Sequence, residues 1–222
     1  MPTTRVFLCR HGETGWNREG RYQGFQDIPL NERGAEQAKQ LATFLKNIEI
    51  HAFYASPLSR ARETAVAIVS AKKLDPAVIR ADQGFAEISH GSHEGMLAAD
   101  VERDNPGLMR AWRAAPHTVV WPKGESVEMV QARAIPAFEK AVRDNPGKSI
   151  LIAAHDAVNK VLLLWAASSP LSKFWVFKQD STCLNVIDVV QGDNGVLSPS
   201  IVMTNSLAHT GKVFADLVHK AL

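Results

Sequence analysis

Short apolar runs alternate along the chain with longer stretches in which apolar residues recur every three or four positions. Runs at residues 5–9, 52–55 and 149–154 have the length of β-strands, and the last is apolar enough for a fully buried central strand. The stretches with helical spacing are 31–46, 58–73, 126–143 and 157–167. Because strands and helices alternate, the pattern predicts βαβ units and a parallel sheet.

The pattern is less regular in the middle and near the end of the chain. A short strand near 78–80 is followed by several short helices at about 97–115. Two later strands, at 182–190 and 199–205, flank the turn sequence Gly192-Asp193-Asn194-Gly195. They predict a hairpin, so we expect a sheet that is mostly rather than wholly parallel.

Composition and charge narrow the classes of function. The chain has 222 residues, 45% hydrophobic and 22% charged, which predicts one globular domain over residues 1–222. Basic residues number 25 and acidic residues 23, without long runs of like charge, so we expect neither nucleic acid nor a membrane surface as a partner. No secretion signal or membrane-length apolar run is recognisable, and we expect a cytoplasmic protein.

Two further features concern packing. Residues from about 211 to 222 have apolar side chains at helical spacing and predict a C-terminal helical tail. This tail either covers the body of the protein or contacts a second subunit, which leaves a homodimer open. Cys9 and Cys183 each lie in a predicted strand, so we expect both thiols to be reduced and buried.

The candidate chemistry begins directly after the first predicted strand, in Arg10-His11-Gly12-Glu13-Thr14. Open α/β sheets place their sites at the carboxyl ends of strands. His11 at such an end, beside the cation of Arg10, can attack a phosphoryl group as a nucleophile. Asn17 and Gln23 follow in the next loop and supply donors for phosphoryl oxygens.

Other candidates follow later strands. Arg60 and Arg62 open the helix after strand 52–55 and point to different faces, so at most one reaches an anion; we choose Arg62 and regard Arg60 as facing solvent or an ion pair. Glu87 has apolar neighbours that are expected to raise its pKa and make it an acid, with simple pairing to an arginine as the alternative. His155 follows the central strand and adds another donor.

These motifs resemble the histidine phosphatase superfamily, also called phosphoglycerate mutase-like. The matches run in the family's order from about residue 5 to about residue 160 and comprise Arg10-His11-Gly12-Glu13-Thr14, Ser56-Pro57-Leu58 with Arg62, Glu87 with Gly91 and Glu94-Gly95, Gly124-Glu125-Ser126, and His155. The resemblance implies a three-layer α/β/α sandwich with a mostly parallel central sheet. It also implies a phosphohistidine intermediate without a metal or other cofactor.

The resemblance also implies roles for single residues. His11 is the nucleophile, attacking phosphorus in line. Glu87 protonates the leaving alkoxide and then takes a proton from the hydrolytic water. The side chains implied to hold the phosphoryl oxygens are Arg10, Arg62 and His155, with Asn17 and Gln23 as supporting contacts.

The chain departs from the family after His155, where Asp156 replaces the more usual glycine. We expect Asp156 to be the N-cap of the helix at 157–167, and repulsion of the substrate's phosphate is the alternative. Ser126 is likewise expected to be an N-cap.

Hydrolysis is favoured over transfer by the spacing of the acid and the second histidine. Glu87 and His155 are separated by 68 positions (155 − 87), whereas phosphoglycerate mutases of the family carry a longer insertion there. Less cover should let water reach the phosphohistidine. A phosphoglycerate mutase, a sugar-phosphate or bisphosphate phosphatase, and an inactive domain that binds phosphorylated ligands remain alternatives.

The substrate prediction depends on His90. The run Glu87-Ile-Ser-His90-Gly91 is similar to one in metal-independent phosphoserine phosphatases, where it borders the leaving group, so L-phosphoserine is the first candidate among small phosphorylated metabolites. The alternative is a loop histidine bonded to the backbone. Tyr22 is a second candidate for the pocket wall, with core packing as its alternative. His93 is expected to be exposed, and His90, His93 and Glu94 lack the further ligand that a metal site needs.

Overall fold

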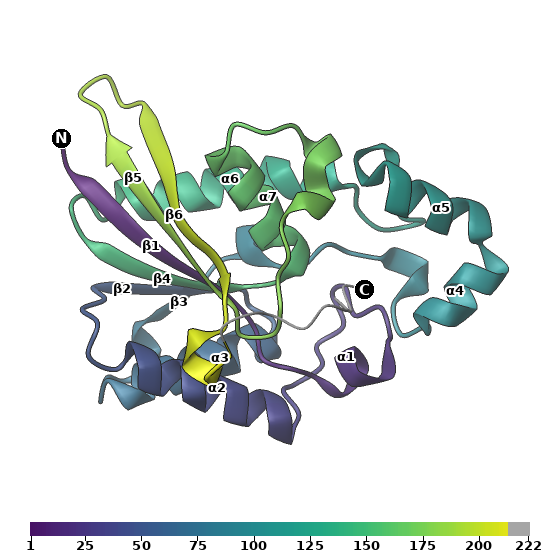
Figure 1. Cartoon of the computed structure of the whole chain (residues 1–222), viewed down its shortest axis with the longest axis horizontal. Helices are drawn as coiled ribbons and strands as arrows, with labels where there is room; N and C mark the ends of the chain where they lie inside the picture. Colours follow the sequence, from purple (N-terminus) through teal and green to yellow (C-terminus); the bar gives the residue numbers. More distant parts are fainter. Residues whose placement is uncertain (213–222) are drawn as a thin grey trace.

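The centre of the protein is a six-stranded sheet between two layers of helices (Figure 1). The structure is a computed structural model, and it describes residues 1–212. The strands lie in the order β3-β2-β4-β1-β5-β6. Their bounds are Thr3–Arg10 (β1), Ala52–Ala55 (β2), Ile79–Ala81 (β3), Ser149–Ala154 (β4), Leu184–Gln191 (β5) and Leu197–Ser206 (β6). Strands β3, β2, β4 and β1 are parallel neighbours, and β5 and β6 add an antiparallel hairpin.

The helices cover both faces of this sheet and extend beyond one edge. In Figure 1, α2 and α3 lie on one face, α6 and α7 lie on the other, and α1, α4 and α5 lie on the side toward which the parallel strands point. Their bounds are Gly15–Glu19 (α1), Glu32–Leu45 (α2), Ser59–Ala71 (α3), Ala98–Asp104 (α4), Pro106–Ala114 (α5), Val127–Arg143 (α6) and Asp156–Ala166 (α7). The expected three-layer α/β/α sandwich with a largely parallel sheet is confirmed.

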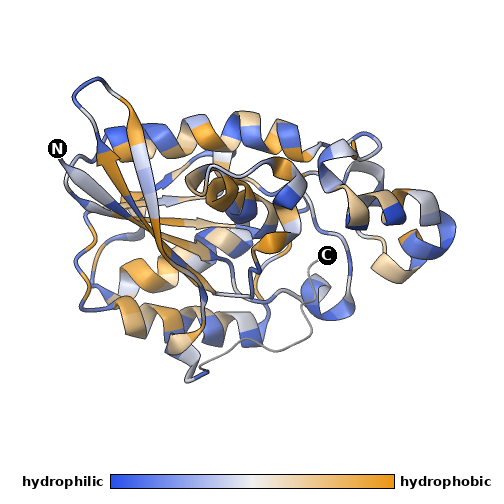
Figure 2. Ribbon diagram, turned by 45° about the horizontal axis from the view of Figure 1, so that its top comes forward, coloured by the Kyte–Doolittle hydropathy of each residue, from blue (hydrophilic) through white to orange (hydrophobic). Residues whose placement is uncertain are grey.

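Alternate residues of the strands pack into two separate cores. On β1, Val6 and Leu8 join the cluster beneath α6 and α7, whereas Phe7 and Cys9 join the cluster beneath α2 and α3. Successive side chains of a strand point to opposite faces, so a strand covered on both sides must be apolar throughout. Figure 2 shows these strands largely in orange between helices that carry both orange and blue residues.

Most predicted elements are present with small changes at their ends. The strands at 52–55 and 149–154 and the C-terminal hairpin are confirmed, and both cysteines are buried and unpaired. Helix α1 was not predicted, because five residues are too few to show helical periodicity. The predicted tail at about 211–222 lies, from residue 213 onward, outside the described residues. Within residues 1–212, no helix is long and apolar enough to cross a membrane.

Candidate active site

Two histidines meet at the carboxyl edge of the sheet because β1 and β4 are parallel neighbours. Arg10 and Ala154 are partners at the end of this pairing, so His11 and His155 follow at adjacent strand ends. Their ring centroids are 5.1 Å apart, and the two residues are 2% and 0% exposed. The parallel pairing of β1 and β4 therefore brings together two histidines that are far apart in the sequence.

The tautomer of His11 follows from one short contact. Its Nδ1 lies 2.6 Å from the carbonyl oxygen of Gly12, and because a carbonyl only accepts, Nδ1 must carry the proton. Nε2 then holds the free lone pair. Burial, reinforced by the charges of Arg60 and Arg10, lowers the pKa of His11 well below its ordinary value. His11 is thus a neutral imidazole with a nucleophilic nitrogen at neutral pH.

The turn that carries His11 is held in place by α2 and α3. A Cβ on Gly12 would lie 2.4 Å from the carbonyl oxygen of Gly34 on α2, so only glycine permits this approach. The backbone N–H of Gly12 donates to Thr64 Oγ1 on α3 at 3.1 Å. Gly12 therefore allows the turn that carries His11 to pack closely against both helices.

Arg60, not Arg62, is the buried arginine whose charge acts on both histidines, so the choice of Arg62 is wrong. Arg62 is exposed and borders a surface groove between α2 and α3, whereas Arg60 is 0% exposed. The physical reason is helical periodicity: Arg60 lies one turn before Thr64 on the buried face of α3, and Arg62 lies on the outer face. Burial lowers the pKa of Arg60 to about 10, which leaves it charged at neutral pH.

Several buried nitrogen atoms of the cluster have no hydrogen-bond partner within the described part of the chain. They are Nε of Arg10, Nε of Arg60 and both ring nitrogens of His155. Buried polar groups are seldom left unpaired. Arg10 is fixed by a 2.6 Å bond from its Nη1 to the carbonyl oxygen of Gln179. The cluster therefore has spare donor capacity and two positive charges, as an anion with several oxygens requires.

Glu87 lies over the N-terminus of α7, beside the cluster. Its Oε1 accepts from the backbone N–H of Ile88 at 3.0 Å and of Ala157 at 3.2 Å, and its Oε2 accepts from the N–H of Asp156 at 3.1 Å. Burial raises the pKa of Glu87, and the nearby carboxylate of Asp156 raises it further. Glu87 therefore lies at the N-terminus of α7 beside the cluster, with the raised pKa that a role as an acid requires.

Arg133, on α6, holds the loop that carries Glu87, and it was not singled out in the sequence. It donates to the carbonyl oxygens of Ala86 at 2.6 Å and Glu87 at 2.8 Å. It also forms a two-point ion pair with Glu125, both contacts at 2.8 Å. No local sequence pattern predicts this, because Arg133 and Glu87 are distant in the chain.

Asn17 and Gln23 are anchored close to this site through Thr14. The side-chain oxygen of Asn17 accepts from the Thr14 N–H at 3.1 Å, and that of Gln23 accepts from the Thr14 hydroxyl at 2.9 Å. Because the side-chain oxygens of Asn17 and Gln23 are used in these bonds, their amide nitrogens are the atoms that can donate to a ligand. Asn17 and Arg10 border a cleft of about 570 Å³ that opens between α2 and the segment around Asp180.

Tyr22 and His90 lie together in an aromatic cluster. Their ring centroids are 4.7 Å apart, and His90 is 4.6 Å from Trp121. Burial lowers the pKa of His90 to about 3, so it is a neutral group, and neither ring nitrogen has a partner within residues 1–212. His93 is buried rather than exposed as expected. Among the described residues, no group of three or more His, Cys, Asp or Glu side chains is arranged to hold a metal ion.

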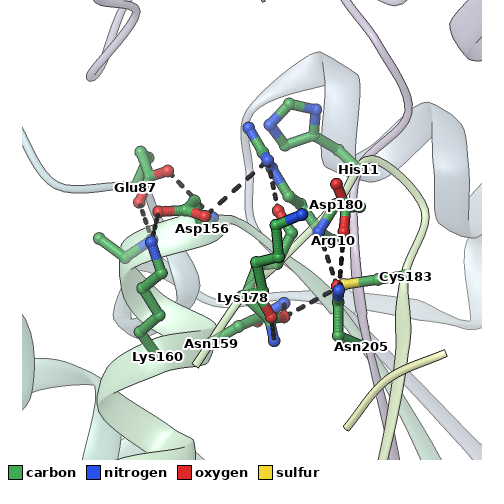
Figure 3. Close-up of polar contacts among 12 residues, drawn as sticks. Arg10, His11, Glu87, Asp156, Asn159, Lys160, Lys178, Asp180, Cys183 and Asn205 are labelled. Carbon is green, nitrogen blue, oxygen red and sulfur yellow. Dashed lines mark hydrogen bonds and ion pairs between the residues drawn. The ribbon is translucent and has the colours of Figure 1, made fainter. Parts of the chain in front are cut away.

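Asp156 is not the N-cap that the sequence indicates. Helix α7 begins at Asp156, and His155 occupies the N-cap position. The Asp156 carboxylate pairs with Lys160 Nζ at 2.7 Å and lies 3.8 Å from Arg10 Nη1 (Figure 3). Ser126, by contrast, is confirmed as an N-cap, accepting from the N–H of Met129.

Comparisons with known proteins identify the family of the chain. A sequence profile described as histidine phosphatase superfamily, branch 1, matches residues 6–200. Phosphoserine phosphatase 1 of Hydrogenobacter thermophilus is 34% identical over 218 residues, which cover 98% of this chain and 99% of that protein.

Solved structures are similar over nearly the whole chain. YhfR of Bacillus stearothermophilus matches with a TM-score of 0.84 at 31% identity and covers 93% of this chain and 98% of its own. The mycobacterial glucosyl-3-phosphoglycerate phosphatase matches with a TM-score of 0.82 at 26% identity and covers 92% and 99%. The chain therefore belongs to branch 1 of the histidine phosphatase superfamily and is a phosphatase of that family.

Proposed function

We propose that the chain hydrolyses a small phosphomonoester through a covalent phosphoryl group on His11. The observation that carries this proposal is the bond from His11 Nδ1 to Gly12, which leaves Nε2 as the nucleophilic atom. Arg10 and Arg60 supply positive charge beside it, and His155 supplies a neutral donor. An enclosed site makes such charges more effective than they would be in water.

In the first step, Nε2 of His11 attacks phosphorus in line with the ester bond. The N–P bond forms as the P–O bond to the leaving group breaks, and the leaving oxygen takes the proton of Glu87. Arg10 and Arg60 stabilise the charge on the phosphoryl oxygens, most strongly in the transition state.

In the second step, water attacks the phosphohistidine. Glu87, now a carboxylate, accepts a proton from the water as its oxygen bonds to phosphorus. The P–N bond breaks, its electron pair returns to His11 Nε2, and inorganic phosphate leaves with Glu87 protonated again. No metal ion is needed for this sequence of proton and electron movements.

The first candidate substrate is L-phosphoserine. The support is the similarity to phosphoserine phosphatase 1 and the position of His90 three residues after Glu87. Because His90 is neutral, it would serve as a hydrogen-bond donor to a substrate carboxylate and not as a cation. The similarity to a glucosyl-3-phosphoglycerate phosphatase favours the same broader class, small phosphoesters that carry a carboxylate.

The test is phosphate release by the wild type and by His11→Ala from phosphoserine, 3-phosphoglycerate, fructose bisphosphates and other sugar phosphates. We expect His11→Ala to lose on the order of 10⁴-fold or more in kcat with an unchanged circular dichroism spectrum. His51→Ala, at an exposed position, is the matched control and should retain activity. Phosphate release by His11→Ala at the wild-type rate would refute the proposal. Rapid 2-phosphoglycerate formation would favour a mutase, and inactivity on every ester would favour a binding domain.

A further inference from the structure

An ion pair between Asp156 and Lys160 is almost wholly buried beside Glu87. Lys160 Nζ lies 2.7 Å from Asp156 Oδ2, and the two side chains are 1% and 6% exposed. Desolvating two charges costs about as much as their attraction returns, so a buried pair adds little stability over apolar residues of the same size. Stability therefore does not explain why α7 carries this pair at its N-terminus.

Asp156 contacts both Glu87, the proposed acid, and the guanidinium group of Arg10. Its backbone N–H donates to Glu87 Oε2 at 3.1 Å. Its carboxylate Oδ1 lies 3.8 Å from Nη1 of Arg10 (Figure 3). One residue thus lies between the proton donor and the phosphate-binding guanidinium.

Lys160 connects the pair to an aromatic segment on its other side. Its Nζ lies 4.5 Å from the ring centroid of Trp175 and 5.1 Å from that of Phe174. Both rings belong to the 3₁₀ segment Leu171–Val176. These cation–π contacts, together with the carboxylate, compensate the ammonium group for its lost water.

The charges around Glu87 come from four elements and oppose one another. Arg10 from β1 and Arg60 from α3 favour the ionised form of Glu87. Asp156, from α7, favours the protonated form, and Lys160 weakens its field. Arg133, from α6, binds the backbone carbonyl of Glu87. The imidazoles of His11 and His155 are uncharged, because burial lowers the pKa of both.

We propose that Asp156 and Lys160 are positioning residues for Glu87: the Asp156 carboxylate keeps the proton on Glu87 against two guanidinium groups, and Lys160 limits that effect. This rests on the proposed function, which gives Glu87 the proton-transfer role. Neither residue of the pair exchanges a proton in the cycle. Glu87 alone gives its proton to the leaving oxygen and regains one from water.

Removing the Asp156 anion and removing the Lys160 cation should shift the high-pH limb of kcat/KM, where Glu87 loses its proton, in opposite directions. Asp156→Asn removes the anion, so this limb should move down by about one pH unit. Lys160→Met leaves the anion less compensated, so the limb should move up by a similar amount. The double variant Asp156→Asn with Lys160→Met buries neither charge of the pair. Its limb should lie below that of the wild type, by less than in Asp156→Asn alone, and the comparison with the wild type keeps the test usable if a single variant does not fold.

The matched control is Lys140, on α6, and Asp144, at the C-cap of that helix, an exposed ion pair with the same spacing. Asp144→Asn and Lys140→Met make the same chemical changes and should leave the limb in place. If the buried pair has only a structural role, Asp156→Asn and Lys160→Met will change the stability or kcat but will not shift the pH profile in opposite directions.

The experiment combines these pH profiles with carbon-13 NMR titration of the Glu87 carboxyl group, assigned by comparison with Glu87→Gln. Opposite movements of the limb and of the carboxyl titration in Asp156→Asn and Lys160→Met support the proposal. Movements in the same direction, or none, overturn it. If the wild type hydrolyses no ester, or His11→Ala keeps full activity, the proposed function fails, and the NMR titration still decides on the pair.

Discussion

The backbone N–H of Gly12 donates a hydrogen bond to the hydroxyl of Thr64 at 3.1 Å. This bond joins the turn carrying the candidate nucleophile to the helix that carries Arg60. Thr64 in turn donates to the carbonyl oxygen of Arg60 at 2.8 Å, so one turn of α3 sets the distance between cation and imidazole. Positions on this face of α3 should therefore affect catalysis, and positions on the opposite face should not.

The first prediction compares the two arginines of α3. Arg60→Met should lower kcat/KM by about 10²–10³-fold, because it removes a buried positive charge beside the phosphoryl group. Arg62→Met should leave kcat/KM unchanged, because Arg62 is exposed on the outer face. Equal losses in the two variants would contradict this assignment, and thermal unfolding of each checks that the fold persists.

The second prediction concerns the close approach of Gly12 to α2. Gly12→Ala should lower the free energy of unfolding by about 1–3 kcal/mol, because the new methyl group would collide with the Gly34 carbonyl. Gly15→Ala is the control, since a Cβ there meets no atom of the described chain within 4 Å. Urea unfolding of both variants measures the difference, and a Gly12→Ala protein as stable as Gly15→Ala would refute the explanation.

The third prediction concerns the pH dependence of stability. The pKa of buried His90 falls to about 3, so the unfolded chain binds a proton there that the folded chain does not. Stabilisation from the neutral ring is then present above the unfolded pKa of about 6.5 and is lost as the pH falls. Between pH 7 and pH 5, the wild type should lose about 2 kcal/mol more than His90→Phe. Parallel stability curves for the two proteins would rule this out.

The fourth prediction concerns metal ions. Phosphate release should persist in excess chelator, because His11, Glu87 and the two guanidinium groups supply the nucleophile, the acid and the positive charge. The measurement is the initial rate before and after chelation, followed by addition of Mg²⁺ or Zn²⁺. Loss of activity that a metal restores would contradict the proposed chemistry.

The sequence was sufficient for the sheet and for the residues at its edge. Apolar runs and their spacing predict parallel strands, and parallel strands bring His11 and His155 to one edge. The choice between Arg60 and Arg62 depends on which face of α3 is buried. The small and apolar residues Ala61, Thr64, Ala65 and Ile68 mark that face, and Arg60 lies on it. That signal was present in the pattern.

Other parts of the site depend on contacts that no local pattern reports. Arg133 reaches from α6 to the loop of Glu87, and only the folded chain shows that the two are neighbours. Aspartate is a residue type that often caps helices, but the buried carboxylate of Asp156 pairs instead with Lys160 and lies near Arg10. Local preferences were overruled here by tertiary packing.

The most direct test of the account is the stereochemical course of the reaction at phosphorus, measured with a phosphorothioate ester that is chiral through two oxygen isotopes and is hydrolysed in water carrying the third isotope, so that the thiophosphate product is chiral. Attack by His11 followed by attack of water inverts phosphorus twice, so we predict net retention of configuration. Net inversion would show that water attacks the ester directly, and it would contradict a phosphoryl group carried by His11.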